Sequence, residues 1–198
     1  MFEKPFSQAC ENNKYPICEH LQRLLATTKT LLEIGSGTGQ HAVYFSAELP
    51  HLQWQTSDRL VNHEGINLWI NENPQANLLH PIALDVISDP WPQTQYNAIY
   101  SANTAHIMPW AAVQAMFKGV GELLTAGGIF VLYGPFKING DFTSDSNAQF
   151  DAFLRENQAE QGIRNLEDLV SLATAAGLTL RENNPMPANN QLLVFKKD

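Results

Sequence analysis

Cysteine and basic residues are both scarce in this sequence, and each scarcity excludes a class of protein. The two cysteines, Cys10 and Cys18, lie too close together for a disulfide framework and do not form a C-x-x-C pair. We therefore expect reduced thiols, no metal site and a cytoplasmic protein. Twelve lysines and arginines face twenty aspartates and glutamates, a formal net charge of −8, and no basic cluster is longer than Lys196-Lys197. This balance disfavours nucleic acid as the main partner and leaves a small molecule as the expected one.

Long hydrophobic runs are missing as well. Nowhere do about 18 apolar residues follow one another, and the opening MFEKPFSQACENN lacks a basic segment followed by an apolar one. We expect neither a membrane span nor a secretion signal. With 44% hydrophobic residues, a chain of this length can still bury a substantial core, and we expect one domain over residues 1–198.

Apolar residues alternate along the chain between short unbroken runs and helical spacing. This alternation is typical of parallel strands joined by crossover helices, and it predicts an α/β fold. The predicted strands are residues 30–34, 52–58, 78–86, 96–103, 129–136, 178–183 and 192–197, of which the last two should form an antiparallel pair. The predicted helices are residues 15–25, 40–49, 66–73 and 113–124, one around 150–154 and one over 165–176. We expect Pro16 in the first turn of the first helix and Gly127-Gly128 at the end of the fourth.

The stretch LLEIGSGTGQH passes from a predicted buried strand through three glycines into a helix. Glycines at such a turn expose backbone N–H groups and let a ligand touch the chain, as nucleotide-like cofactors require. A P-loop is excluded because no Gly-Lys-Ser/Thr follows. A dinucleotide fingerprint would need its third glycine at position 40, where Gln40 stands. The spacing of Gly35, Gly37 and Gly39, with Glu33 ahead of them to meet a cationic amino group, favours S-adenosylmethionine.

Two further carboxylates fall at predicted strand ends, where open parallel sheets bind their ligands. Asp58 follows Gly39 by nineteen residues and can accept hydrogen bonds from both ribose hydroxyls, a role shared by NAD-binding proteins and methyltransferases. Asp85 stands where an adenine amino group can be bound, with Val86 and Ile87 near the ring. The alternative for each aspartate alone is an ordinary turn residue.

These motifs resemble class I S-adenosylmethionine-dependent methyltransferases and, more narrowly, a family of uncharacterised methyltransferase-like proteins of bacteria and animals. The narrower resemblance rests on ENNKYPI, LLEIGSGTGQH, YSANTAHI, GPFKINGDFTSDSNAQFDAFLR and MPANNQLLVF, and it covers nearly the whole chain. The resemblance implies a Rossmann-like fold with a seven-stranded, mostly parallel sheet in the order 3-2-1-4-5-7-6. Strand 7 would be antiparallel, with helices on both faces of the sheet.

A cofactor-binding set follows from the loop, the strand ends and the resemblance. It comprises Glu33, Gly35, Ser36, Gly37, Gly39, His41, Asp58, Asp85, Val86 and Asn103. The histidines show no metal-ligand spacing.

Catalytic and substrate residues are less sharply indicated. Methyl transfer from a sulfonium is an in-line displacement, so the protein mainly positions the nucleophile and excludes water. His106 is the candidate base, with a pKa range suited to proton transfer near pH 7; the alternative is a histidine satisfied by backbone at the start of a helix. The candidates for the substrate pocket are Asn13, Lys14, Tyr133, Asn189 and Asn190. Asn13 and Lys14 can instead belong to a frayed terminus, and Asn189-Asn190 can simply supply a turn.

The missing motifs narrow the substrate. No N/D-P-P-Y/F follows the fourth strand, so a nucleobase or glutamine target is not indicated. The sequence favours a methyltransferase acting on oxygen, nitrogen or sulfur of a small molecule. Two alternatives stay open: a protein that binds S-adenosylmethionine without turnover, and a NAD-dependent oxidoreductase.

Overall fold

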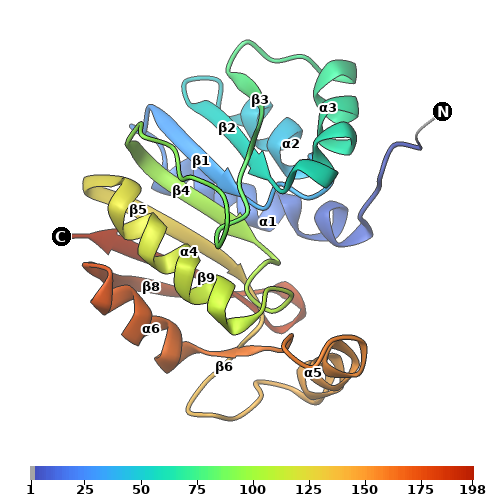
Figure 1. The fold of residues 1–198 in the computed structure, drawn as a ribbon, viewed down its shortest axis with the longest axis vertical. Helices are drawn as coiled ribbons and strands as arrows, with labels where there is room; N and C mark the ends of the chain where they lie inside the picture. Colours follow the sequence, from blue (N-terminus) through green and yellow to red (C-terminus); the bar gives the residue numbers. More distant parts are fainter. Residues whose placement is uncertain (1–2) are drawn as a thin grey trace.

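The computed structural model describes residues 3–198 and places a mostly parallel sheet between two layers of helices (Figure 1). The sheet has seven strands in the order β3-β2-β1-β4-β5-β9-β8. Their bounds are β1 Thr30–Ile34, β2 Gln53–Asp58, β3 Leu78–Ala83, β4 Tyr96–Ala102, β5 Leu124–Gly134, β8 Leu178–Met186 and β9 Asn190–Lys197. Strand β9 runs antiparallel to both of its neighbours, and the other pairs are parallel.

The predicted strand order is confirmed. Counting only the strands of this sheet, β8 is the sixth and β9 the seventh, so the order is 3-2-1-4-5-7-6. The labels run higher because two short strands, β6 (Phe136–Lys137) and β7 (Arg164–Asn165), form a separate parallel pair.

Helices cover both faces of the sheet, with α1, α2 and α3 on one side and α4 and α6 on the other (Figure 1). Their bounds are α1 Gln8–Leu24, α2 Gln40–Glu48, α3 His63–Glu72, α4 Trp110–Leu123, α5 Asp145–Asn157 and α6 Leu166–Ala175. Short 3₁₀ turns, η1 (Leu60–Asn62) and η2 (Pro187–Asn189), follow β2 and β8.

Each central strand supplies apolar side chains to both cores, because successive residues of a strand point to opposite faces. In β1, Leu31 packs with α1 and α2, whereas Leu32 packs with α4. In β5, Val131 and Leu132 divide in the same way. Strands buried on both faces read as unbroken apolar runs, which explains the sequence pattern.

Three predicted boundaries are wrong. Pro16 lies inside α1 rather than in its first turn, because the helix begins at Gln8 with Ser7 as its N-cap. Gly127-Gly128 does not end α4: that helix stops at Leu123 and β5 follows at once. A Cβ on Gly128 would lie 2.8 Å from the Asn97 carbonyl oxygen, so this glycine permits the close approach of β4 and β5.

The third boundary concerns β3, which was expected to reach Val86. It ends at Ala83, so Asp85 and Val86 lie in the following turn. Within residues 3–198, no helix is long and apolar enough to cross a bilayer.

Candidate functional site

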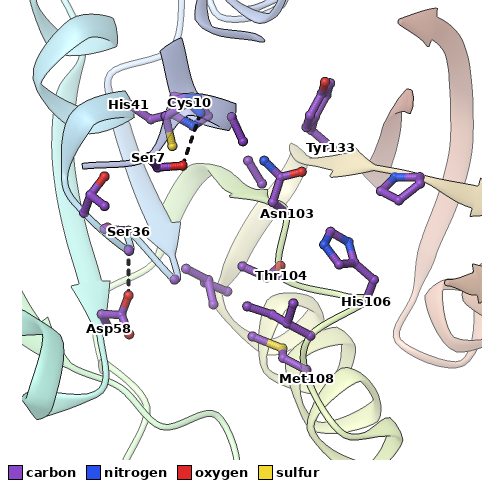
Figure 2. A pocket seen from close by; sticks show the side chains of 18 of the residues that line it. Ser7, Cys10, Ser36, His41, Asp58, Asn103, Thr104, His106, Met108 and Tyr133 are labelled. Carbon is purple, nitrogen blue, oxygen red and sulfur yellow. Dashed lines mark hydrogen bonds between the residues drawn. The ribbon is translucent and has the colours of Figure 1, made fainter. Parts of the chain in front are cut away.

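A cavity of about 1060 Å³ opens at the carboxyl ends of the parallel strands. Its walls come from the segments that follow β1, β2, β3, β4 and β5, together with the start of α1, helix α5 and the turn between β8 and β9. Small-molecule sites typically measure roughly 300–1,000 Å³, so this one has room for a cofactor and a second small molecule. Figure 2 shows side chains from the start of α1, the glycine loop and the β4–α4 segment facing this space.

The three loop glycines are required for different reasons, although all have positive φ: +73° at Gly35, +60° at Gly37 and +91° at Gly39. A Cβ on Gly35 would lie 2.7 Å from Thr104 Cγ2, and one on Gly39 would lie 3.2 Å from Ile66 Cα. These two glycines therefore allow close packing of the chain on itself. A Cβ on Gly37 would meet no protein atom within 4 Å, and Gly37 lines the cavity. Gly37 is thus the position where a ligand can lie against the backbone.

Glu33 is almost fully buried beneath the loop, at 2% exposure. Its Oε2 accepts hydrogen bonds from Ser36 Oγ at 2.9 Å and from Trp54 Nε1 at 3.0 Å. Burial raises the pKa of Glu33 to about 7, and these hydrogen bonds oppose the rise. No group within residues 3–198 donates to Oε1, so one carboxylate oxygen is available at the cavity wall.

Asp58 stands at the end of β2 with both oxygens engaged by the surrounding turn. Gly37 N donates to Oδ2 at 2.7 Å, and Arg59 N and Asn62 Nδ2 donate to Oδ1, each at 2.7 Å. Figure 2 shows the first of these bonds as a dashed line between the loop and the carboxylate. The carboxylate is thereby fixed at the wall with 7% exposure.

Asp85 lies in the turn after β3 beside apolar side chains. Its Oδ1 accepts a hydrogen bond from Ile87 N at 3.0 Å, and its own N–H donates to Asp89 Oδ2 at 2.7 Å. Val86 and Ile87 line the cavity next to Asp85. This part of the wall combines a hydrogen-bond acceptor with apolar side chains, which suits an apolar ring that carries a donor.

A buried polar group forms the floor of the cavity beneath α1 and α2. His41 Nε2 lies 2.7 Å from Asn13 Oδ1, and its Nδ1 lies 3.4 Å from the Tyr100 hydroxyl. Burial lowers the pKa of His41 to about 4, so the ring is neutral at pH 7. Burial raises the pKa of Tyr133, which the Asn13 amide partly offsets.

His106 faces the cavity from the segment between β4 and α4. The residue is 6% exposed, and its ring meets the ring of Phe150 edge to face, with 5.3 Å between centroids. Burial and, secondly, the charge of Arg164 lower the pKa of His106 to about 4. Burial and the Arg164 charge thus hold this pKa below the range that the sequence alone suggests. Neither ring nitrogen has a protein hydrogen-bond partner within the described chain, and neither is sealed from the cavity.

Backbone contacts hold the His106 segment in place. Arg164 donates from Nε to Ala105 O at 2.9 Å and from Nη2 to Met108 O, while Gly162 N donates to His106 O at 2.9 Å. Asn103, just before this segment, has a left-handed backbone with φ +56°. Figure 2 shows its amide directed into the space between His106 and Tyr133.

Most of the predicted site residues meet at this one cavity. Those that line it are Asn13, Glu33, Gly35, Ser36, Gly37, His41, Asp58, Asp85, Val86, Asn103, His106, Tyr133 and Asn190. Their assigned roles stay predictions.

Three predicted residues do not line the cavity. Lys14 pairs with Glu11 and lies against the ring of Tyr44, away from the cavity. Asn189 takes a left-handed backbone in the β8–β9 turn and its Nδ2 donates to Ser146 Oγ. Gly39 packs against α3, as described above.

Sequence reasoning missed the residues that other segments bring to the site. They include Ser7, Cys10, Thr104, Met108, Pro135, Asn147, Pro187 and Ala188. These residues come from five separate parts of the chain and share no local motif. The one usable signal was the polar stretch before Pro16, which forms the first two turns of α1.

The strand order and the position of the cavity define the class I methyltransferase fold, and solved structures share it. An O-methyltransferase family protein from Burkholderia thailandensis superposes with a TM-score of 0.82 at 13% identity, over 92% of this chain and 55% of that one. An O-methyltransferase family 2 protein from Planctomyces limnophilus, in complex with apigenin, superposes with a TM-score of 0.81 at 19% identity. The match covers 96% of this chain and 58% of that one. PigF with SAH superposes with a TM-score of 0.78 at 15% identity, over 92% of this chain and 55% of that one. The chain thus spans little more than half the length of these structures.

The family itself is shown by a match over almost the entire chain. The model described as "Protein of unknown function (DUF938)" matches residues 4–197, and the chain belongs to that family.

Proposed function

We propose that this protein is an S-adenosylmethionine-dependent methyltransferase that acts on a small molecule. The observation that carries the proposal is that Glu33, Asp58 and Asp85 line one cavity together with Gly37, whose N–H donates to Asp58. Strands β1 and β2 supply Glu33 and Asp58, and the turn after β3 supplies Asp85. Such an arrangement matches a ligand with an ammonium group, a ribose and an adenine.

The residues present fit this cofactor. The free Oε1 of Glu33 can accept from the ammonium group, and the open backbone at Gly37 permits close approach. Asp58 Oδ2 accepts only one hydrogen bond from residues 3–198, so it can accept another from a ribose hydroxyl, and Asp85 with Val86 can bind the adenine edge and face. The methyltransferase fold shared with the solved structures, one of which contains SAH, supports the same assignment.

In the proposed reaction, the bound sulfonium supplies an electrophilic methyl group. The chain's own residues hold the acceptor in line with that methyl and keep water out, which accounts for much of the rate. His106 is neutral at pH 7 and open to the cavity, so it can take the proton that the acceptor releases.

The first test is calorimetric titration with S-adenosylhomocysteine, with NAD and NADP as parallel controls. We expect micromolar or tighter binding of S-adenosylhomocysteine alone. Binding of a nicotinamide cofactor instead would overturn the proposal in favour of an oxidoreductase. Binding of S-adenosylhomocysteine without methyl transfer to any member of a broad metabolite library would indicate a binding protein without turnover.

A substitution pair makes the titration specific. Asp58→Ala removes a charged acceptor and should weaken binding about ten- to a hundredfold, corresponding to roughly 1.5–3 kcal/mol. Asp141→Ala, at an exposed loop position outside the cavity, should bind as the wild type does. Unchanged affinity in Asp58→Ala would contradict the ribose assignment.

A further inference from the structure

We infer that the methyl acceptor is an uncharged aromatic molecule that reacts through a hydroxyl on its ring. The inference rests on the proposed function and deepens it, because it concerns the part of the cavity beyond the carboxylates. This part, called the acceptor end, is built from the β4–α4 segment, the segment after β5, α5 and the β8–β9 turn. Its lining residues include Asn103, His106, Met108, Tyr133, Pro135, Asn147, Phe150, Pro187, Ala188 and Asn190.

Charge is distributed unequally along the cavity. Its four lining residues with ionised side-chain types are Glu33, Asp58, Arg59 and Asp85, all in or just after β1, β2 and β3. Among the residues described, the acceptor end contributes no Lys, Arg, Asp or Glu to the wall. A carboxylate or phosphate on the acceptor would lose its hydration there without gaining a partner. The acceptor end therefore selects an uncharged molecule.

The apolar surface at this end suits a flat ring. Phe150 contributes an aromatic side chain that is 37% exposed, and Met108, Pro135 and Pro187 add apolar surface around it. Aromatic rings pack with favourable edge and face contacts against such groups. The Asn103 amide can bond to an oxygen substituent. The Asn147 Oδ1 can accept from a hydroxyl because, among the described residues, only its Nδ2 is engaged, with Thr143 and Asn189, whereas a thiol is a weak donor and acceptor.

Proton transfer restricts the hydroxyl to an acidic one. The pKa of His106 is about 4, and the described residues include no cluster that could hold a metal ion to activate an alcohol. A phenolic hydroxyl has a pKa of about 10, so transfer to this imidazole crosses roughly 6 pKa units. For a hydroxyl as weakly acidic as water, with a pKa of about 15.7, the same transfer would cross roughly 12 pKa units. A ring hydroxyl is therefore within reach of this base when transfer is coupled to methylation.

In the methyl-transfer step, the methyl carbon gains one bond and loses one. An O–CH₃ bond forms as the S–CH₃ bond of the donor breaks, and the sulfonium becomes a neutral thioether. The hydroxyl proton moves to His106, which becomes an imidazolium and later releases the proton to water. No oxidant or reductant is involved.

The test uses ligands that share one ring system: 2-naphthol, 2-naphthalenemethanol and 2-naphthoate. Each is titrated into the full-length protein saturated with S-adenosylhomocysteine, and each is incubated with radiolabelled S-adenosylmethionine. We expect 2-naphthol to bind at least tenfold more tightly than 2-naphthoate and to be methylated, with no transfer to 2-naphthalenemethanol. Tighter binding of the carboxylate, transfer to the alkyl alcohol, or neither binding nor methylation of 2-naphthol would overturn the inference.

A matched pair of variants localises the binding. Phe150→Leu removes a ring that lines the acceptor end, and Phe153→Leu removes a more exposed ring of the same helix that does not line the cavity. We expect the affinity for 2-naphthol to fall about fivefold or more in Phe150→Leu only, with S-adenosylhomocysteine affinity unchanged in both. An equal loss of 2-naphthol affinity in both variants would contradict binding of the ring against Phe150. Failure of S-adenosylhomocysteine binding in the wild type would instead refute the proposed function.

Discussion

At the scale of single residues, Glu33 couples the buried wall of the cavity to pH. Its pKa of about 7 means that the carboxyl is half protonated near neutrality in the unliganded protein. An ammonium group requires the ionised form, so binding at pH 6 must first remove a proton from most molecules. We expect S-adenosylhomocysteine to bind about tenfold more weakly at pH 6 than at pH 8. Calorimetry in two buffers of different ionisation enthalpy would also detect the released proton.

Glu33→Gln supplies the control for that pH dependence. The variant should bind less tightly at pH 8 and lose the dependence between pH 6 and 8, whereas Glu122→Gln, at an exposed site on α4, should retain it. A pH dependence that persists in Glu33→Gln would assign the titration to another group.

Stability should depend on the same carboxyl, and burial fixes the sign. Because the folded pKa of about 7 exceeds the ordinary glutamate pKa of 4.5, folding favours the protonated form. Below pH 4.5, Glu33 therefore does not lower the unfolding free energy of the wild type. That free energy falls as the pH rises through 7. Relative to wild type, Glu33→Gln should gain up to about 3 kcal/mol of unfolding free energy between pH 5 and pH 8. Urea denaturation of both proteins at pH 5 and pH 8 measures the two unfolding free energies. The same difference between variant and wild type at both pH values would be inconsistent with a buried, titrating Glu33.

At the scale of elements, one guanidinium makes several of the contacts that hold the segment between β4 and α4. Arg164 donates hydrogen bonds to the carbonyls of Ala105, Met108 and Glu160 and is half buried. Arg164→Gln should lower the unfolding free energy by about 2–3 kcal/mol, because buried acceptors lose charged donors. Arg181→Gln breaks only an exposed pair with Asp198 and should cost less than about 1 kcal/mol.

A second readout separates positioning from simple stabilisation. The charge of Arg164 contributes to the lowered pKa of His106, so the His106 pKa should rise in Arg164→Gln. NMR titration of the histidine ring protons measures it. An unchanged pKa would show that burial alone controls this imidazole.

The chain before α1 also has a defined contact. Pro5 packs on Gly65 of α3, where a Cβ would come within 2.6 Å of the proline ring, and Trp69 Nε1 donates to Pro5 O. Gly65→Ala should favour the helix by about 1 kcal/mol while displacing Pro5. We expect faster amide exchange over residues 7–13 and weaker S-adenosylhomocysteine binding, because Ser7, Cys10 and Asn13 line the cavity. Glu64→Ala, an exposed neighbour, should change neither.

The errors in predicting elements have physical causes. The start of α1 was missed because its first two turns contain mostly polar residues, and a helix whose early turns pack through Asn13 has no apolar stripe there. The glycines after α4 were assigned to a helix end because glycine commonly stands there, whereas they serve a close approach between strands. Local propensity cannot distinguish these uses.

At the scale of the whole molecule, ligand binding should appear as thermal stabilisation. S-adenosylhomocysteine at one hundred times its dissociation constant should add about 2.7 kcal/mol if the unfolded chain does not bind it. For a chain of 198 residues this corresponds to a rise in melting temperature of about 5–10 °C. Differential scanning calorimetry would measure the rise, and NAD at the same concentration should produce none.

Sheet topology was predictable because periodicity marks strands buried on both faces, and the resemblance supplied their order. The cofactor end of the cavity was predictable for a related reason: Glu33, the glycines and Asp58 lie at predicted strand ends. The acceptor end was predicted only in part: His106, Tyr133 and Asn190 are candidates from sequence, whereas Met108, Pro135 and Pro187 reach the cavity only through folding. The burial that moves the pKa of His106 to about 4 is equally a property of the packed structure.

The two ends of the cavity derive from successive parts of the chain. Residues up to Ile87 provide the carboxylate end, apart from the structural contact of Thr104 on Gly35, and residues from Asn103 onward provide most of the acceptor end. A gene encoding such a protein can therefore exchange its second portion between relatives and keep Glu33, Asp58 and Asp85 together, while Asn103 and Thr104 come from the second parent. New specificities within this family should arise by recombination between β3 and β4, and chimaeras joined there would retain S-adenosylhomocysteine affinity while taking the acceptor preference of the second parent.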